Sequence, residues 1–362
     1  MANRSLDSGH AKQARSIMRR TPIILLVSCM LAACSKSEKA ASPLPEVSAV
    51  RLNLAFTCVH EVDHLPPINP EADKLFQYGR YLEKKDGPKD FNDVARYYRI
   101  AAAHGHYRAN HNLQILISSG AAPSPDSEKE SVDLAEQLVK AGVASGYYDI
   151  GHYLLNGYGL QRDEEAARRY IRKAADLGRA DAQYYVANLL DPADAAPDIA
   201  RQMFQCAAEQ GHAEAANYLG VSLQTDEKFS DAAKAFQMSV AAGSSQSALL
   251  LEESFEAKTA KNPLYVLGEQ PDAERSRRYE LIGAFLRGDD GRNPKVPDLD
   301  KIAPLPPAKL PHWDGTFQWQ KEQNAATPPQ KPSDELINEM AKTKHLDPAT
   351  GLPLPGSEDK SS

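Results

Sequence analysis

The sequence lacks the features that would point to a membrane-spanning, nucleic-acid-binding or nucleotide-dependent protein. Its apolar run from Pro22 to Leu31 is about ten residues long, whereas a membrane-spanning helix needs roughly 20. Positive charge is not in excess, since Lys and Arg number 42 against 49 Asp and Glu. No G-x-S-x-G nucleophile elbow, P-loop or dinucleotide-binding glycine fingerprint is present. With 42% hydrophobic residues, the composition is that of a globular chain with a core.

The N-terminal residues carry the pattern of a bacterial secretory signal. Arg19 and Arg20 precede the apolar run, and small residues follow it. The segment "LAAC", which ends at Cys34, resembles the lipobox of bacterial lipoproteins. The resemblance implies a signal peptide over residues 1–33, with Met18 as an alternative start, and lipidation of Cys34. Cleavage by an ordinary signal peptidase is the alternative.

The resemblance to lipoproteins also implies a location. Three acyl chains on Cys34 would anchor the protein stably, and Ser35 after the cysteine implies the periplasmic face of the outer membrane. Loss of residues 1–33 would leave 37 basic residues (42 − 5) and 48 acidic residues (49 − 1), a net charge of −11. Such a chain repels phosphate backbones, so we expect no nucleic-acid partner, and it would attract a basic protein.

Cysteine is scarce, with four residues in the chain. Cys29 would leave with the signal peptide and Cys34 would carry lipid, so Cys58 and Cys206 remain. An oxidising compartment such as the periplasm permits a disulfide between them. The sequence leaves a disulfide and two buried free thiols as equal alternatives, because bridging depends on the geometry of the two residues.

A repeated phrase, "AAxxG", divides the middle of the chain. It ends at Gly105, Gly178 and Gly211, and weaker versions end at Gly146 and Gly243, so that successive spacings are 41, 32, 33 and 32 residues. A period of this length is typical of helix-turn-helix solenoids, in which each unit buries its apolar face against its neighbours. The sequence therefore predicts an all-α fold, an α/α solenoid of superhelical repeats.

Each repeat reads as two helices. In "DEEAARRYIRKAADLG" the apolar residues form one stripe at helical spacing and the basic residues fall on the other side. The glycine that follows can adopt the left-handed conformation that ends a helix. A small residue recurs at one position of the first helix, which would allow close packing: Gly79, Gly151, Ala187 and Gly220.

These repeats resemble Sel1-like repeats. The segment from Tyr148 to Gly178 contains one complete repeat, with Gly151 in the first helix, the glycine turn "NGYGL", Asp163 before the second helix and "AADLG" at its end. The flanking units match only in part. The resemblance implies a superhelix related to tetratricopeptide arrays and a role in binding other proteins.

The chain divides into five predicted regions. They are the signal peptide (1–33), an anchor linker and N-terminal segment (34–69), the Sel1-like solenoid (70–258), a capping helix region (259–290) and a Pro-rich tail with an aromatic turn and a short helix (291–362). We expect Leu54, Phe56 and Val59 to pack the N-terminal segment against the first repeat. Ser333 is the expected N-cap of the short tail helix.

A short motif, "HEVDH" from His60 to His64, matches the H-E-x-x-H pattern of zinc metalloproteases. That pattern works on a helix, where two histidines four residues apart share one face. Here Pro66 and Pro67 follow almost at once, so a helix of adequate length is not expected. The other histidines fall at repeat turns or in first helices. We expect no metal, cofactor or catalytic group.

Aromatic residues are the candidate partner contacts. Tyrosines recur in the first helices, which by resemblance to related solenoids line the concave surface, and both tryptophans lie near one "DG" turn in the tail. The candidates are Tyr147, Tyr153, Tyr184, Tyr218, Trp313, Phe317 and Trp319. The tail aromatics have two interpretations: a hairpin or turn that packs on the solenoid, or an exposed anchor for the partner.

The tail segment "LPxxKLPHWDGTFQWQ" resembles that of bacterial immunity lipoproteins encoded beside phospholipase effectors of type VI secretion. The resemblance implies a non-enzymatic periplasmic protein that binds such a toxin and occludes its active site or its membrane-docking surface. An envelope scaffold or assembly factor is the alternative, and a zinc hydrolase is a more distant one.

Overall fold

A computed structural model of the chain describes residues 54–192, 195–256, 265–288 and 292–356. The predicted signal peptide and Cys34 lie outside these residues. Within them the regular elements are helices, together with one isolated antiparallel bridge between Leu346 and Pro353. No helix in this part of the chain is both long and apolar enough to cross a membrane.

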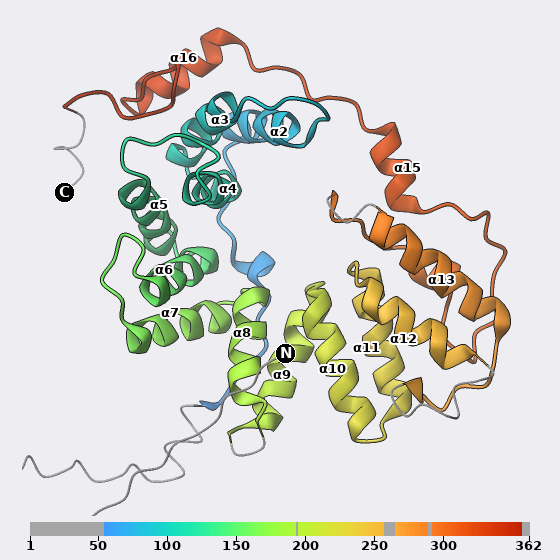
Figure 1. The fold of residues 1–362 in the computed structure, drawn as a ribbon. Helices are drawn as coiled ribbons and strands as arrows, with labels where there is room; N and C mark the ends of the chain where they lie inside the picture. The colour runs from blue at the N-terminus through green and yellow to red at the C-terminus, as the bar shows by residue number, and fades with distance from the viewer. Residues whose placement is uncertain (1–53, 193–194, 257–264, 289–291, 357–362) are drawn as a thin grey trace, which may run out of the picture. The chain divides into compact units, whose positions relative to one another are not determined.

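Six consecutive helix pairs form the body of the described chain, and each helix packs against the one before it and the one after it (Figure 1). The pairs are α2 (Pro70–Lys84) with α3 (Phe91–Ala103), α4 (Tyr107–Ser118) with α5 (Ser127–Lys140), α6 (Ala144–Asn156) with α7 (Glu164–Asp176), α8 (Ala180–Leu190) with α9 (Pro197–Glu209), α10 (Ala213–Thr225) with α11 (Phe229–Ala241), and α12 (Ser245–Phe255) with α13 (Ala273–Gly288). The predicted α/α solenoid is confirmed.

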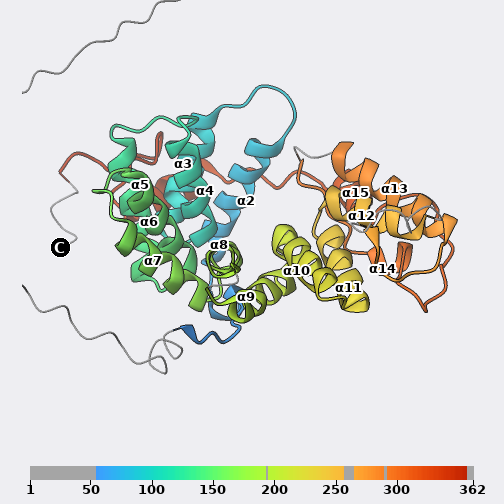
Figure 2. The same ribbon diagram turned by 60° about the horizontal axis from the view of Figure 1, so that its bottom comes forward.

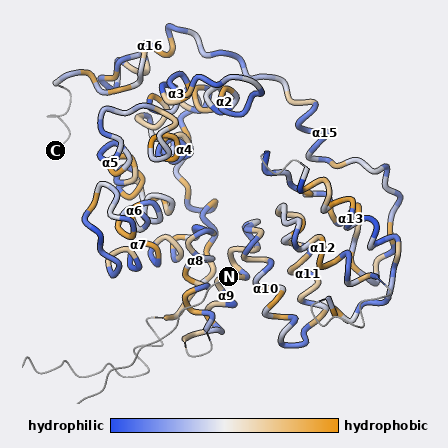
Figure 3. The backbone as a smooth tube through the Cα atoms, viewed as in Figure 1, coloured by the Kyte–Doolittle hydropathy of each residue, from blue (hydrophilic) through white to orange (hydrophobic). Residues whose placement is uncertain are grey.

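The complete repeat shows why the helices begin and end where they do. Gly157 ends α6 in the left-handed conformation, with φ 68°. Asp163 then caps α7, because its carboxylate accepts a hydrogen bond from Ala166 N at 2.9 Å. Within α7, Ala167 and Ile171 lie on the predicted apolar stripe and are buried. Figure 3 shows the resulting alternation of apolar and polar stretches within individual helices.

The recurring small residues set the distance between the two helices of a pair. A Cβ atom added to Gly151 would lie 2.5 Å from the Ile171 side chain, and one added to Gly220 would lie 2.6 Å from the Phe236 ring. Both neighbours belong to the second helix of the same pair. The glycines therefore allow a close approach that any larger residue would obstruct.

The last helix pair extends beyond the predicted end of the repeats at residue 258. Tyr279 and Ile282 of α13 are buried in one cluster with Leu251 and Phe255 of α12. The segment predicted as a separate capping region (259–290) therefore contains the second helix of the sixth pair. A long connection between α12 and α13 interrupts the period of about 32 residues, which hid this pair in the sequence.

The N-terminal segment, residues 54–64, lies against the third and fourth helix pairs and not against the first repeat as predicted. We call this segment the strap. Phe56 packs on the cluster formed by α7 to α11, and Val59 O accepts a hydrogen bond from Gln183 Nε2 of α8 at 2.9 Å. A Cβ atom on Gly178 would lie 2.5 Å from Glu61 N, so this glycine makes room for the strap. The strap ends in the short 3-10 helix η1 (Glu61–His64).

The tail, residues 292–356, contacts both the last and the first repeats. It contains α14 (Leu299–Ile302), α15 (Gln318–Ala325) and α16 (Asp334–Thr343). Leu299 and Ile302 are buried with α11 to α13, and Figure 2 shows α14 at that end of the array. Ile337 and Met340 of α16 are buried with α2 to α4. Ser333 caps α16 as predicted, since its hydroxyl accepts from Leu336 N at 3.2 Å.

Candidate functional site

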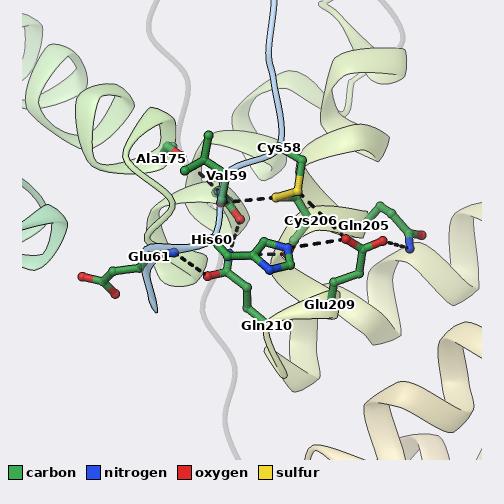
Figure 4. Close-up of a disulfide and its surroundings, with 10 residues drawn as sticks. Cys58, Val59, His60, Glu61, Ala175, Gln205, Cys206, Glu209 and Gln210 are labelled. Carbon is green, nitrogen blue, oxygen red and sulfur yellow. Dashed lines mark hydrogen bonds and ion pairs between the residues drawn. A yellow bond between two sulfur atoms is a disulfide. The ribbon is translucent and has the colours of Figure 1, made fainter. Parts of the chain in front are cut away.

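The strap is fixed to the fourth helix pair by a covalent bond. Cys58 and Cys206 of α9 form a disulfide, with their Cα atoms 5.5 Å apart (Figure 4). Next to the disulfide, Glu61 N donates a hydrogen bond to Gln210 Oε1 at 3.0 Å. Of the two alternatives that the sequence leaves for these cysteines, the structure has the disulfide.

The two histidines of "HEVDH" do not form the zinc site of a metalloprotease. The segment from Glu61 to His64 is a 3-10 helix of four residues, too short to place two ligands on one α-helical face. Within the described residues, the ligand atoms that lie together are those of Cys58, His60 and Cys206, and His64 is not among them. The prolines after the motif explain the early end of the helix.

The strap forms one wall of an open pocket of about 590 Å³. The other walls come from first helices of the repeats, namely α2, α4, α6 and α8. Val62 projects from the strap, with 69% of its surface exposed. Tyr107 and Arg108 of α4 also line the pocket, with the guanidinium 5.7 Å from the Tyr107 ring centroid. The pocket therefore offers apolar, aromatic and cationic groups side by side.

A chain of charges joins the strap to α8 and α10 at the edge of this pocket. Glu61 lies 3.2 Å from Arg179, which lies 2.6 Å from Asp181, which in turn lies 3.5 Å from His212. Burial alone would raise the pKa of Asp181, but the hydrogen bond with His212 and the charge of Arg179 together lower it to about 2. These charges pair with one another, so they position the strap and the helix ends.

Exposed apolar side chains gather on the first helices of the repeats. We call this set the first-helix face. It comprises Ile115 on α4, Leu189 on α8, Tyr218 and Val221 on α10, and Leu249 on α12, which are between 41% and 53% exposed. Exposed apolar side chains on several units of an array are candidates for contacts with a protein partner.

The four predicted tyrosines do not all reach this face. Tyr153 packs beside α5, and its hydroxyl donates to Gln114 Oε1 at 2.8 Å, so it is part of the helix packing. Tyr147 is half-buried against Tyr170. Tyr184 and Tyr218 lie together, with ring centroids 5.7 Å apart, and Tyr218 is 44% exposed. Tyr184 thus supports Tyr218, which is the exposed member of the predicted set.

The tail aromatics pack on α13, which corrects the prediction for Phe317. That ring is 6% exposed and stacks on Phe285 at a centroid distance of 4.0 Å, so it belongs to the core and is not a free contact. Trp319 meets Phe285 at 5.9 Å, and Trp313 Nε1 donates to Thr316 O at 2.9 Å. Both tryptophans are half-buried. The segment is a turn followed by α15, and not a hairpin.

Several solved protein structures are similar to this chain. The immunity protein Pa5087 from Pseudomonas aeruginosa matches with 27% identity and a TM-score of 0.55, over 70% of this chain and 95% of that chain. The chain is similar to this immunity protein, and its consecutive helix pairs resemble Sel1-like repeats. The protein PA5086 of Pseudomonas aeruginosa matches with 29% identity and a TM-score of 0.54, also over 70% and 95% of the two chains.

A third structure shares the fold of this repeat protein. The immunity protein PA5088 from Pseudomonas aeruginosa is 24% identical, with a TM-score of 0.57 over 70% of this chain and 94% of that chain. A family described as a domain of unknown function (DUF6396) matches residues 247–354, which hold the sixth helix pair and most of the tail. No curated protein sequence matches the chain.

Sequence reasoning missed most of the first-helix face. Tyr218 was among the predicted contacts, but Ile115, Leu189, Val221 and Leu249 were not. The sequence could have revealed them, because they are large aliphatic residues of first helices that do not lie among the buried positions. Val221, for example, directly follows the buried Gly220.

Proposed function

We propose that this protein is a periplasmic immunity protein that binds and occludes a phospholipase toxin delivered by type VI secretion. On this proposal the lipid on Cys34 holds it at the periplasmic face of the outer membrane. The observation that carries the proposal is the similarity to immunity protein Pa5087 over 95% of that protein's length. The resemblance of the tail to immunity lipoproteins encoded beside phospholipases supports the choice of toxin.

The first-helix face supports the same conclusion on physical grounds. A phospholipase must present apolar surface to a bilayer before its substrate can enter the active site. The exposed aliphatic and aromatic side chains of the first-helix face can cover part of such a surface, because removal of apolar area from water is favourable. Occlusion is sufficient for inhibition, so the protein needs no chemistry of its own.

The charge of the chain fits capture of a basic toxin. The net charge after loss of residues 1–33 is −11 (37 − 48). Complementary charge raises association rates, and the gain falls with ionic strength. Rapid capture matters for an immunity protein because a toxin that reaches phospholipid first has already acted.

A survival experiment tests the proposal. On this proposal a phospholipase gene adjoins the gene of this protein, and its product would be exported to the periplasm of a bacterial strain that delivers no toxin of its own, with and without this protein. We expect growth with the protein and lysis without it. A version lacking residues 1–33 is the matched control, because it should bind the toxin when purified but fail to protect from the cytoplasm. Equal killing with and without the full chain would contradict the proposal.

A further inference from the structure

Four metal-ligand side chains meet where the strap crosses α9 (Figure 4). Cys58 and His60 come from the strap, two positions apart in an extended segment, so that both side chains leave it on the same side. Cys206 and Glu209 come from α9, three positions apart, which places them on one helical face. The polypeptide thus brings two pairs of ligands together from segments 148 residues apart.

The distances suit a small tetrahedral ion. The ligand atoms of Cys58, His60 and Cys206 all lie within 4.8 Å of one another. The fourth ligand is close too, since Glu209 Oε2 is 3.6 Å from His60 Nε2 and 4.0 Å from Cys58 Sγ. Zinc binds thiolate sulfur at about 2.3 Å and imidazole nitrogen at about 2.0 Å, so ligands around it stand roughly 3.3 to 3.8 Å apart. The two sulfur atoms are bonded at 2.05 Å in the oxidised chain, so reduction would let them separate, and side-chain rotations that include Glu209 would complete the site.

Hydrogen bonds from neighbouring groups orient these ligands in addition to the disulfide. Gln205 Nε2 donates to Glu209 Oε1 at 2.7 Å, which leaves Oε2 facing His60. Backbone hydrogen bonds to Gln183 and Gln210 fix the strap on either side of His60. Such outer contacts orient metal ligands in known zinc sites. Cys58 is exposed, so an ion can enter from solvent.

We propose that the reduced protein binds one Zn²⁺ through Cys58, His60, Cys206 and Glu209. The disulfide and the metal exclude each other, because the same two sulfur atoms are used. A dithiol or phosphine reductant supplies two electrons to break the sulfur–sulfur bond, and two protons convert the products to thiols. Zinc then displaces both thiol protons and is held by two thiolates, one neutral imidazole and one carboxylate.

The two states keep the strap in the same place. In the oxidised chain the disulfide joins the strap to α9, and in the reduced chain the metal joins the same residues. A chain that has not yet been oxidised would therefore hold its strap, and the pocket wall formed by Val62, by means of zinc. His60, the first residue of "HEVDH", thereby acquires a role that does not involve His64.

The test uses the full purified protein, reduced with a phosphine, freed of reductant without oxygen and titrated with Zn²⁺ against a chromophoric chelator. We expect one zinc per reduced chain and none per oxidised chain. Co²⁺ should give thiolate charge-transfer bands and the intense visible bands of a tetrahedral ion. His60→Ala should weaken zinc binding by at least about 100-fold, because removal of even an outer-shell contact costs 10- to 100-fold.

His64→Ala is the matched control, since it removes an exposed histidine of the same segment and should leave the affinity unchanged. Circular dichroism follows folding in parallel. If reduction alone lowers the helical signal, zinc should restore it in the parent and not in the Cys58→Ser, Cys206→Ser variant. Absence of zinc binding by the reduced parent, or equal affinity in His60→Ala and the parent, would overturn the proposal.

Discussion

The strap and the tail both lie outside the helix pairs, but different forces attach them. The strap is held by a disulfide, by hydrogen bonds to Val59 and Glu61 and by partial burial of Phe56, and none of its residues is fully buried. The tail is held by burial: Leu299, Ile302 and Phe317 enter the core of the last repeats. Attachment of the strap therefore relies on the two cysteines that join it to α9, and attachment of the tail relies on apolar packing.

Arginine side chains complete the attachment of the tail. Arg278 of α13 donates to Ile302 O at 2.6 Å and to Pro311 O at 2.9 Å. Arg99 of α3 donates to Thr350 O at 3.2 Å. Irregular backbone leaves carbonyl groups without partners, and a buried guanidinium with several donors can satisfy them. Prolines in the tail strengthen this requirement because they cannot take part as donors.

Removal of the disulfide should have the largest effect. In a chain-entropy model a cross-link that closes 148 residues stabilises the folded state by about 5 kcal/mol. We expect the Cys58→Ser, Cys206→Ser variant to lose up to this amount in urea unfolding. Native tryptophan emission should not change, because both tryptophans lie in the tail. A red shift of the tryptophan emission in the folded variant would show that loss of the disulfide also loosens the tail. That result would contradict the separate attachment of the two segments.

Phe317→Ala should release the tail while leaving the strap in place. Truncation of a buried phenylalanine costs about 3 to 5 kcal/mol. Tryptophan emission should shift to the red, since Trp313 and Trp319 pack around the same ring pair. The disulfide should still form, which mass spectrometry after thiol alkylation can check. Trp319→Phe is the control, because it keeps an aromatic ring next to Phe285.

Gly220→Ala tests the close packing between the two helices of a pair, which forms the body on which the strap and the tail lie. The new Cβ would meet the Phe236 ring at 2.6 Å, and overpacking of this kind costs about 1 to 3 kcal/mol. Gly283→Ala is the matched control, because its nearest neighbour is the flexible end of Arg287 at 3.2 Å. In the control, alanine's better helix propensity should make the change neutral or stabilising. Equal losses in thermal unfolding would contradict the role assigned to Gly220.

A pH effect should be the smallest. Burial lowers the pKa of His106, whose Nδ1 accepts from Ala109 N at 3.1 Å to cap α4. The folded pKa lies below the ordinary value of 6.5, so the unfolded chain binds the extra proton first. The contribution of neutral His106 to the free energy of unfolding is therefore complete above pH 6.5 and is lost as the pH falls below that value. His106→Asn keeps a cap without a titrating group. In this variant the thermal unfolding midpoint should change less between pH 7 and pH 5 than it does in the parent protein.

The repeats could be predicted from the sequence because their rules are local. The spacing of "AAxxG" and the cap at Asp163 fix helix pairs through contacts within about 30 residues. Placement of the strap could not be predicted, because its contacts join residues far apart in the sequence. Cys58 bonds to Cys206 of α9, and Val59 accepts a hydrogen bond from Gln183. Burial of Phe317 likewise depends on Phe285, which no local pattern connects to it. The aliphatic residues of the first-helix face could be identified only after the structure showed which positions of each first helix are buried.

Inhibition of the phospholipase in solution tests the central claim most directly. The proposed toxin, purified, would hydrolyse phospholipid vesicles while this protein is titrated in. We expect hydrolysis to stop at one equivalent. Val221→Asp on the first-helix face should abolish inhibition, and Lys140→Ala, an exposed change at the end of a second helix, should not. Undiminished hydrolysis at saturating concentrations of the parent protein would contradict the account.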